Sequence, residues 1–184
     1  MDAISERFRR VAAGFSERAQ GEPEDAWEQP SPCEGWTARD VVRHLVEWVP
    51  AFFEAAGAPS LPPLPSPHDD PAGAWEALRA GVQGWLDDPE LATSVIEHPR
   101  AGRHALCDAV GTFVVGDVLV HTWDLARATG QDETLDPDEV ARTLAGSQPV
   151  EELMRSSGQY GPRVEVPTDA DLQARLIAFT GRQP

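Results

Sequence analysis

The spacing of apolar residues predicts a chain built mostly from helices. Five segments carry apolar side chains at every third or fourth position, and they are 3–20, 37–57, 72–87, 109–129 and 137–156. This period is that of an amphipathic helix with one face toward a core. A last helix is expected to begin at Thr168, with Asp171 three residues on, and to end at Gly181. Long helices with little strand between them predict an all-α four-helix bundle with additional short helices.

Residues that commonly begin or end helices support these boundaries. Gly21 and Pro23 follow the first segment and are expected to end it. Thr37 is suited to be the N-cap of the second helix, because Asp40 stands three residues later as its capping partner. Asp136 is the expected N-cap of the fifth helix, since a proline follows it directly.

Two regions are expected to lie outside the helices. Residues 58–71 contain six prolines, which neither a helix interior nor a sheet accommodates, so we expect a surface connection. Two short extended pieces, around 93–97 and 103–107, flank a turn from Pro99 to Gly102. This arrangement predicts a small β-hairpin.

Composition and charge narrow the partners that the chain could have. The 184 residues carry a net charge of −16, with 41% hydrophobic and 25% charged residues, as expected for a single globular domain over 1–184. Nucleic acids and anionic membranes require a basic surface, so we expect neither as a partner. No stretch approaches about 18 uncharged apolar residues, and the N-terminus lacks the apolar core of a signal peptide. A cytoplasmic location is therefore expected.

The candidate chemistry lies on the helix over 109–129. Its core-facing stripe is expected to comprise Val110, Val114, Asp117, His121, Leu125 and Ala128. Asp117 and His121 are four residues apart, so their side chains project from the same face. An unpaired carboxylate in an apolar interior costs several kcal/mol. A divalent cation would compensate for that cost, and a D-x-x-x-H pair on a helix can chelate one. A structural pair of Asp117 with a histidine or an arginine is the alternative.

The helix over 37–57 offers a third candidate ligand. His44 lies beside apolar residues of this helix and could meet Asp117 and His121 across the bundle. Two imidazoles and one carboxylate would leave an open coordination position, which is typical of catalytic metal sites. Zinc is the expected ion, and nickel, iron and manganese accept the same donors. Asp40 stands four residues before His44, but helix capping explains its presence.

The neighbours of these candidates have simpler explanations. Glu47 and Asp124 each follow a candidate histidine by three residues, and each could be a fourth or outer ligand. We instead expect Glu47 to be solvated and Asp124 to pair with Arg127 or another arginine. Cys33 could be a reactive thiol, although a small buried residue is the simpler interpretation, and Cys107 is expected to serve packing.

The remaining histidines lie in loops or in the predicted hairpin. They are His68, His98 and His104, and we expect all three to be exposed.

Two blocks of the sequence resemble a known family. They are SPCEGWTARDVVRHLVEW, residues 31–48, and GDVLVHTWDLARATGQ, residues 116–131, and residues 161–184 resemble the family's usual ending. On these blocks the chain is similar to an actinobacterial group of metal-binding proteins. That group resembles the N-terminal domain of mycothiol-dependent maleylpyruvate isomerase and belongs to the wider DinB/YfiT-like superfamily.

The resemblance implies a DinB/YfiT-like four-helix bundle with a metal site between its helices. Carried over to this sequence, the family's ligands fall on His44, Asp117 and His121. Asp117 stands where the isomerase-like relatives often have glutamate, so the metal would lie closer to its helix or be bound less tightly. The sequence ends without the isomerase's additional C-terminal domain, so maleylpyruvate isomerisation itself is not expected.

Enzymatic and non-enzymatic functions are both compatible with this resemblance. A metal-dependent enzyme would use a low-molecular-weight thiol, mycothiol by resemblance, to transfer a group to an electrophilic small molecule or to isomerise it. Trp36, Trp48 and Trp123 would then surround its pocket. The alternatives are a non-catalytic metal-binding or sensor protein and a purely structural bundle. A homodimer is compatible with such a small bundle.

Overall fold

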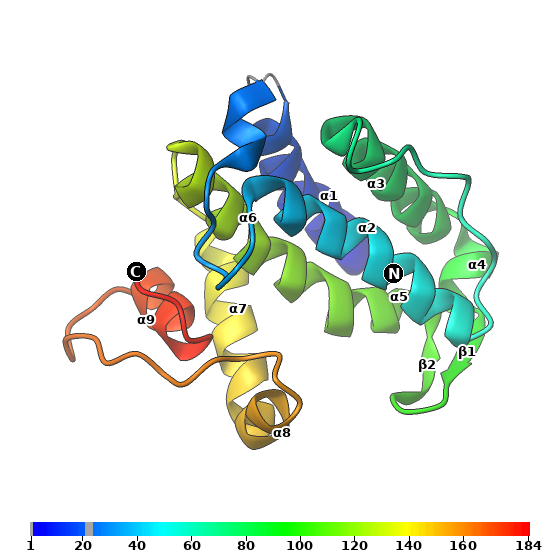
Figure 1. Ribbon diagram of the computed structural model, residues 1–184. Coiled ribbons are helices and arrows are strands. Elements are labelled where there is room, and N and C mark those ends of the chain that lie inside the picture. The colour runs from blue at the N-terminus through cyan, green and yellow to red at the C-terminus, as the bar shows by residue number, and fades with distance from the viewer. Residues whose placement is uncertain (1, 21–23) are drawn as a thin grey trace.

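Four long helices form the core of the molecule (Figure 1). The computed structural model describes residues 2–20 and 24–184. The four helices are α1 (Asp2–Ala19), α2 (Ala38–Ala55), α3 (Pro71–Asp87) and α6 (Val115–Thr129). Both α1 and α2 pack against α3 and α6, so the four helices close into a ring. This arrangement confirms the predicted all-α, DinB-like four-helix bundle.

Two short segments extend α6 at its N-terminal end. Helix α5 (Leu106–Ala109) continues into a π-helical turn over Val110–Val114, which leads directly into α6. The predicted helix over 109–129 is therefore three residues longer at its start. Gly130, with a φ of +73°, ends α6 in the left-handed conformation that glycine adopts without strain.

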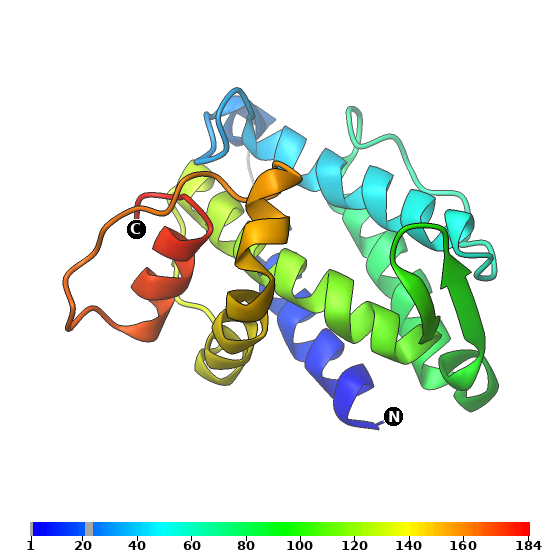
Figure 2. The same ribbon diagram turned by 90° about the horizontal axis from the view of Figure 1, so that it is seen from below.

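The predicted β-hairpin is present beside the C-terminal end of α2, where the Glu97 N–H donates to the Ala56 carbonyl. Helix α4 (Pro89–Thr93) precedes strand β1 (Val95–His98), which pairs antiparallel with β2 (Gly102–Ala105). Residues 106 and 107, expected in the second strand, instead begin α5. The hairpin lies at one end of the bundle, while the C-terminal elements gather at the other end (Figures 1 and 2).

The C-terminal region differs from the prediction in two places. The segment expected to be one helix over 137–156 is divided into α7 (Pro137–Ser147), a 3-10 turn over Gln148–Val150 and α8 (Glu151–Ser156). Pro149 has no N–H for the helical hydrogen-bond ladder, which accounts for the division.

The last helix, α9 (Leu172–Phe179), begins later than predicted. Asp171 rather than Thr168 is its N-cap, because the Asp171 side chain accepts a hydrogen bond from the Ala174 N–H at 2.7 Å.

Capping fixes the start of α2, the helix that carries His44. Thr37 Oγ1 accepts a hydrogen bond from the Asp40 N–H, and Asp40 Oδ2 accepts one from the Thr37 N–H at 2.9 Å. The predicted capping box is thus confirmed, and the role of Asp40 is structural. A 3-10 turn over Glu24–Glu28 lies in the connection from α1. Gly21 and Pro23, predicted to end α1, lie outside the described residues.

The long helical segment that ends in α6 is the centre of the hydrophobic core. In the described part of the chain, Leu106–Thr129 alone is long and apolar enough to cross a membrane by composition. However, 67% of its most apolar stretch is buried within the bundle. Leu125 is fully buried on this helix, as are Phe8 and Phe15 of α1 and Trp75 of α3, so the four helices share one core.

Candidate metal centre

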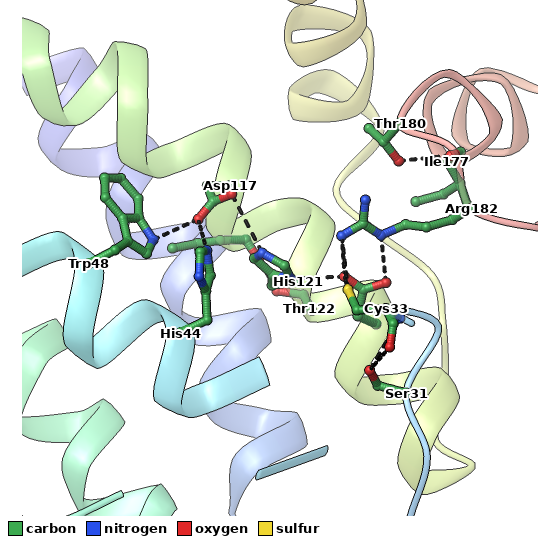
Figure 3. Close-up of polar contacts among 12 residues, drawn as sticks. Ser31, Cys33, His44, Trp48, Asp117, His121, Thr122, Ile177, Thr180 and Arg182 are labelled. Carbon is green, nitrogen blue, oxygen red and sulfur yellow. Dashed lines mark hydrogen bonds and ion pairs between the residues drawn. The ribbon is translucent and has the colours of Figure 1, made fainter. Parts of the chain in front are cut away.

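The three predicted ligands meet at the interface between α2 and α6 (Figure 3). His44 Nε2 lies 3.4 Å from Asp117 Oδ2, and His121 Nε2 lies 3.6 Å from Asp117 Oδ1. The two imidazole rings are 4.8 Å apart between centroids. One potential ligand atom from each residue lies within 4.8 Å of the other two. The structure therefore brings together the three residues that the sequence singled out.

The local helix geometry explains this meeting. The capping box begins α2 at a defined residue and so fixes where His44 lies on the helix. On α6, Asp117 and His121 are one turn apart and project to the same side. The π-helical turn over Val110–Val114 widens the helix just before Asp117 and changes the register of all later side chains.

The predicted stripe of α6 is only partly buried. Val110, Val114, His121 and Leu125 lie in the core as expected. The Asp117 side chain, expected to face the core, retains 32% exposure, and the His44 side chain also retains 32%. The pair lies at the rim of the α2–α6 interface, because polar and aromatic side chains of α2 rather than aliphatic ones face Asp117. The candidate centre is thus partly exposed to solvent on this side.

The surroundings of Asp117 keep its carboxyl group ionised. The Trp48 indole N–H donates a hydrogen bond to Asp117 Oδ2 at 2.9 Å. Burial alone would raise the pKa of Asp117, but the charge of His121, together with His44 and Trp48, holds that pKa below its usual value. An ionised carboxylate is the form that a metal ion requires.

His121 lies between two carboxylates, with one facing each ring nitrogen. Its Nε2 faces Asp117, and its Nδ1 lies 2.8 Å from Asp124 Oδ2. Burial alone would lower the pKa of His121, but the charge of Asp117 and the hydrogen bond to Asp124 raise that pKa to about 10. The imidazole therefore carries a proton at neutral pH when nothing displaces it.

Asp124 is fully buried and pairs with an arginine from the end of the chain. Arg182 donates from Nε to Oδ1 at 2.7 Å and from Nη2 to Oδ2 at 2.8 Å. Burial would raise the pKa of Asp124, but His121 and Arg182 lower it to about 2. The predicted arginine partner is thus Arg182, whereas Arg127 pairs with Glu133. The local sequence could not reveal a partner 58 residues away.

Cys33 completes the group around Asp124. Its Sγ lies 3.3 Å from Arg182 Nη2 and 3.5 Å from Asp124 Oδ2, and its side chain is half-buried. Cys33, His121 and Asp124 also have potential ligand atoms within 4.8 Å of one another. Cys107, by contrast, is buried among apolar side chains, as predicted.

Aromatic rings flank the candidate centre on the α2 side. The Trp36 ring lies 5.1 Å from His44 and is stacked on His121 at 5.9 Å, and the Trp48 ring lies 6.1 Å from His44. Trp36 and Trp48, two of the three tryptophans predicted to surround a pocket, therefore lie beside the candidate ligands. The prediction for Trp123 is wrong, because its side chain is buried in the core with the Arg127 guanidinium over its ring.

The remaining polar candidates lie away from this centre. Glu47 and His68 are exposed, as predicted. The prediction for His98 is wrong, because its ring is buried and stacked on Phe52 at 4.3 Å. Its Nδ1 accepts hydrogen bonds from two backbone N–H groups of the hairpin turn, at Arg100 and Ala101.

His104 is half-buried rather than exposed. Its Nε2 lies 2.8 Å from the Ala101 carbonyl oxygen, so this histidine also stabilises the hairpin turn.

The chemistry of the donors fits a divalent ion. Two imidazole nitrogens and one carboxylate oxygen converge from two helices, and zinc, nickel, iron and manganese all accept this combination. The outer carboxylate of Asp124 on the far nitrogen of His121 is also typical of metal-binding histidines.

Comparison with known proteins relates the chain to one family. A family model described as the mycothiol maleylpyruvate isomerase N-terminal domain matches residues 5–126. Two uncharacterized proteins of Mycobacterium tuberculosis, from the CDC 1551 and H37Rv strains, are each 30% identical to the chain over 159 residues. Each match covers 83% of this chain and 83% of the relative. No solved structure matches the chain.

Proposed function

The chain belongs to the mycothiol maleylpyruvate isomerase N-terminal domain family, and on this premise we propose that it binds one divalent metal ion through His44, Asp117 and His121. Zinc is the expected ion, and nickel, iron and manganese are the alternatives. The family match includes all three residues, and their potential ligand atoms lie within 4.8 Å of one another.

One observation favours a metal site over a purely structural pairing of Asp117 with the two histidines. His44 and His121 lie 3.4 Å and 3.6 Å from the Asp117 oxygens, which is longer than the usual 2.7–3.2 Å of a hydrogen bond. The contact of His121 with Asp124, at 2.8 Å, has the normal length. The three side chains are thus gathered around a common space without bonding tightly to one another, as ligands of a shared ion would be.

We propose further that the protein is an enzyme that uses a small thiol, with mycothiol as the cosubstrate that the family suggests. A divalent ion bound to these residues would act as a Lewis acid and lower the pKa of a thiol. The side chains of His44 and Asp117 are each 32% exposed, so such a molecule would reach the ion from that side. Trp36 and Trp48 would exclude water from the same side and hold an electrophilic substrate by ring contacts. The reaction would be a thiol transfer or a thiol-assisted isomerisation.

Metal content tests the first part of the proposal. We expect elemental analysis of the full chain, purified without a His-tag, to find about one divalent ion per chain, and chelator treatment to lower the melting temperature. His44→Ala and His121→Ala should lose the ion, whereas His68→Ala, which changes an exposed histidine, should retain it. A wild-type chain that holds no metal and melts at the same temperature with added zinc or nickel would overturn the proposal.

Thiol dependence tests the second part. The metal-loaded protein is mixed with an electrophilic small molecule, with and without mycothiol, and product formation is followed. We expect turnover that requires mycothiol and is lost in His44→Ala. Metal binding without any thiol-dependent turnover would instead favour the non-catalytic metal-binding or sensor alternative.

A further inference from the structure

The Asp124 carboxylate is buried, and its close polar neighbours among the described residues come from its own helix α6, from the loop before α2 and from the turn after α9. Its side chain has no exposed area, and it contacts His121 Nδ1, the Arg182 guanidinium and Cys33 Sγ. Arg182 binds both carboxylate oxygens at 2.7 and 2.8 Å, which prevents the carboxylate from rotating. The oxygen that faces His121 is therefore fixed in direction.

This fixed oxygen determines which nitrogen of His121 is free. An imidazole can offer Nε2 to an ion only while its proton resides on Nδ1. Asp124 Oδ2 lies 2.8 Å from Nδ1 and so favours a proton there. Nε2 then points toward Asp117 and His44, on the opposite side of the ring (Figure 3).

The position of Arg182 depends on a tight turn after α9. The Arg182 N–H donates to the Ile177 carbonyl at 3.2 Å, and Gly181 has a φ of +95°. A Cβ at position 181 would lie 2.7 Å from the Gly161 backbone, so only glycine allows this close approach. Arg155 holds the same turn through the Phe179 carbonyl at 2.9 Å, and it contacts neither Asp124 nor His121 among the described residues.

From this geometry we propose that Asp124 and Arg182 are positioning residues for His121, and that the C-terminal segment thereby completes the metal centre. The inference rests on the proposed metal-binding function. The family match ends at residue 126, so it includes Asp124 and not Arg182. A segment outside the matched region thus controls the affinity of a site whose ligands all lie inside it.

The test compares zinc affinity with the stability of the metal-free chain. Zinc Kd is measured by competition with a chromophoric chelator, and melting is measured after metal removal. Arg182→Met should weaken zinc binding by about 10–100-fold, the usual effect of losing an outer partner of a metal-binding histidine. It should also lower the melting temperature, because it leaves Asp124 buried with fewer partners.

A double variant separates positioning from simple anchoring. Asp124→Leu with Arg182→Met removes both charges and keeps similar side-chain shapes, so the metal-free chain should regain most of its melting temperature. Zinc binding should remain about 10–100-fold weaker, because no acceptor then holds the proton on His121 Nδ1. The visible absorption of the cobalt-loaded double variant should also differ from that of the wild type.

Two further variants serve as rescue and control. Arg182→Lys should bind zinc more tightly than Arg182→Met and less tightly than the wild type, since lysine keeps the positive charge but cannot make the bidentate contact with Asp124. Arg7→Met, which breaks the ion pair of Arg7 with the buried Glu139 and touches neither Asp124 nor Arg182, should lower the melting temperature and leave zinc Kd and the cobalt spectrum unchanged.

Two outcomes would overturn the inference, and they are distinguishable. A double variant that binds zinc as tightly as the wild type would show that Asp124 and Arg182 only anchor the C-terminal segment, while metal binding itself stands. A wild-type chain that binds no zinc, nickel, iron or manganese would remove the proposed function and this inference together.

Discussion

Trp48 donates its indole N–H to Asp117 Oδ2 at 2.9 Å, across the interface between α2 and α6. This bond orients the carboxylate of the candidate centre. We predict that Trp48→Phe, which keeps a ring and removes the donor, weakens zinc binding about 10–100-fold, since a hydrogen bond to a charged group contributes about 1.5–3 kcal/mol. Competition titration measures the change. Trp36→Phe is the control, because the Trp36 ring contacts the imidazoles without this bond. Equal zinc affinity in Trp48→Phe would show that the bond is not needed for metal binding.

Metal binding should require a carboxylate at position 117, whereas it should tolerate the longer side chain of glutamate there. Asp117→Ala is predicted to abolish metal binding, because two imidazoles alone form a weak site. Asp117→Glu should retain about one ion per chain by elemental analysis, with a changed affinity. Asp117→Ala that binds metal at full affinity would mean that another carboxylate, Asp40 or Glu47, is the ligand. That outcome would require Asp40 to leave its capping role or exposed Glu47 to turn inward.

Metal binding should tighten as the pH rises. The charge of Asp117 and the hydrogen bond to Asp124 outweigh burial and raise the pKa of His121 from 6.5 to about 10. An ion must therefore displace a proton from His121 at neutral pH. Zinc affinity should rise by about tenfold per pH unit between pH 7 and pH 9, and calorimetry in buffers of different ionisation enthalpy should detect the released proton. A zinc affinity that is independent of pH over this range would contradict a protonated His121.

The same pKa shift has the opposite effect on the metal-free chain. Because the pKa of His121 is higher in the folded chain than in the unfolded chain, its proton stabilises the folded state. This stabilisation is fully present below pH 6.5 and is lost as the pH rises toward 10. In the presence of chelator, the difference in unfolding free energy between the wild type and His121→Gln should therefore decrease from pH 6.5 to pH 10.

Local sequence signals account for the fold and for most of the candidate centre. Apolar periodicity predicts the four bundle helices, and the capping pair Thr37 and Asp40 predicts where α2 begins, as the structure confirms. The blocks at 31–48 and 116–131 predict the family, which the match over residues 5–126 confirms. The i,i+4 spacing of Asp117 and His121 is also local, so it is visible in the sequence.

Contacts between distant segments account for what the sequence does not reveal. Asp124 and Arg182 are separated by 58 residues, and no local pattern indicates that they pair. The helix over 137–156 is a related case, because periodicity continues through Pro149 while the backbone ladder does not. His98 is buried because Phe52 on a different element stacks on it. Asp124 and His98 are placed by contacts with distant segments, and the helix is interrupted by a proline that lacks a backbone donor. The spacing of apolar residues indicates neither of these causes.

The capping box should contribute measurably to stability. Thr37→Ala removes the side chain that accepts the Asp40 N–H, which typically costs about 1 kcal/mol. For a chain of this size we expect a melting temperature about 2–4 °C lower. Thr37→Ser is the matched control, since it keeps the acceptor and should melt close to the wild type. If Thr37→Ala and the wild type melt at the same temperature, the capping box does not contribute measurably to the stability of the fold.

An ion pair with a buried carboxylate joins α1 to α7. Arg7 Nε and Nη2 donate to the two carboxylate oxygens of Glu139 at 3.0 and 2.5 Å, and the Glu139 side chain is only 1% exposed. Arg7→Met should destabilise the fold by about 3 kcal/mol, because it leaves a buried carboxylate with its main partner removed. Urea denaturation measures this loss. Arg9→Met, which changes an exposed arginine, should leave the urea midpoint close to that of the wild type.

The double variant Arg7→Met with Glu139→Leu shows whether an uncompensated charge causes that loss. It removes both charges together, so it should recover most of the stability of the wild type. If the double variant is as unstable as Arg7→Met alone, lost packing of the long Arg7 side chain against α7 is the cause instead. Neither variant changes the candidate metal centre, so zinc Kd should stay at the wild-type value in both.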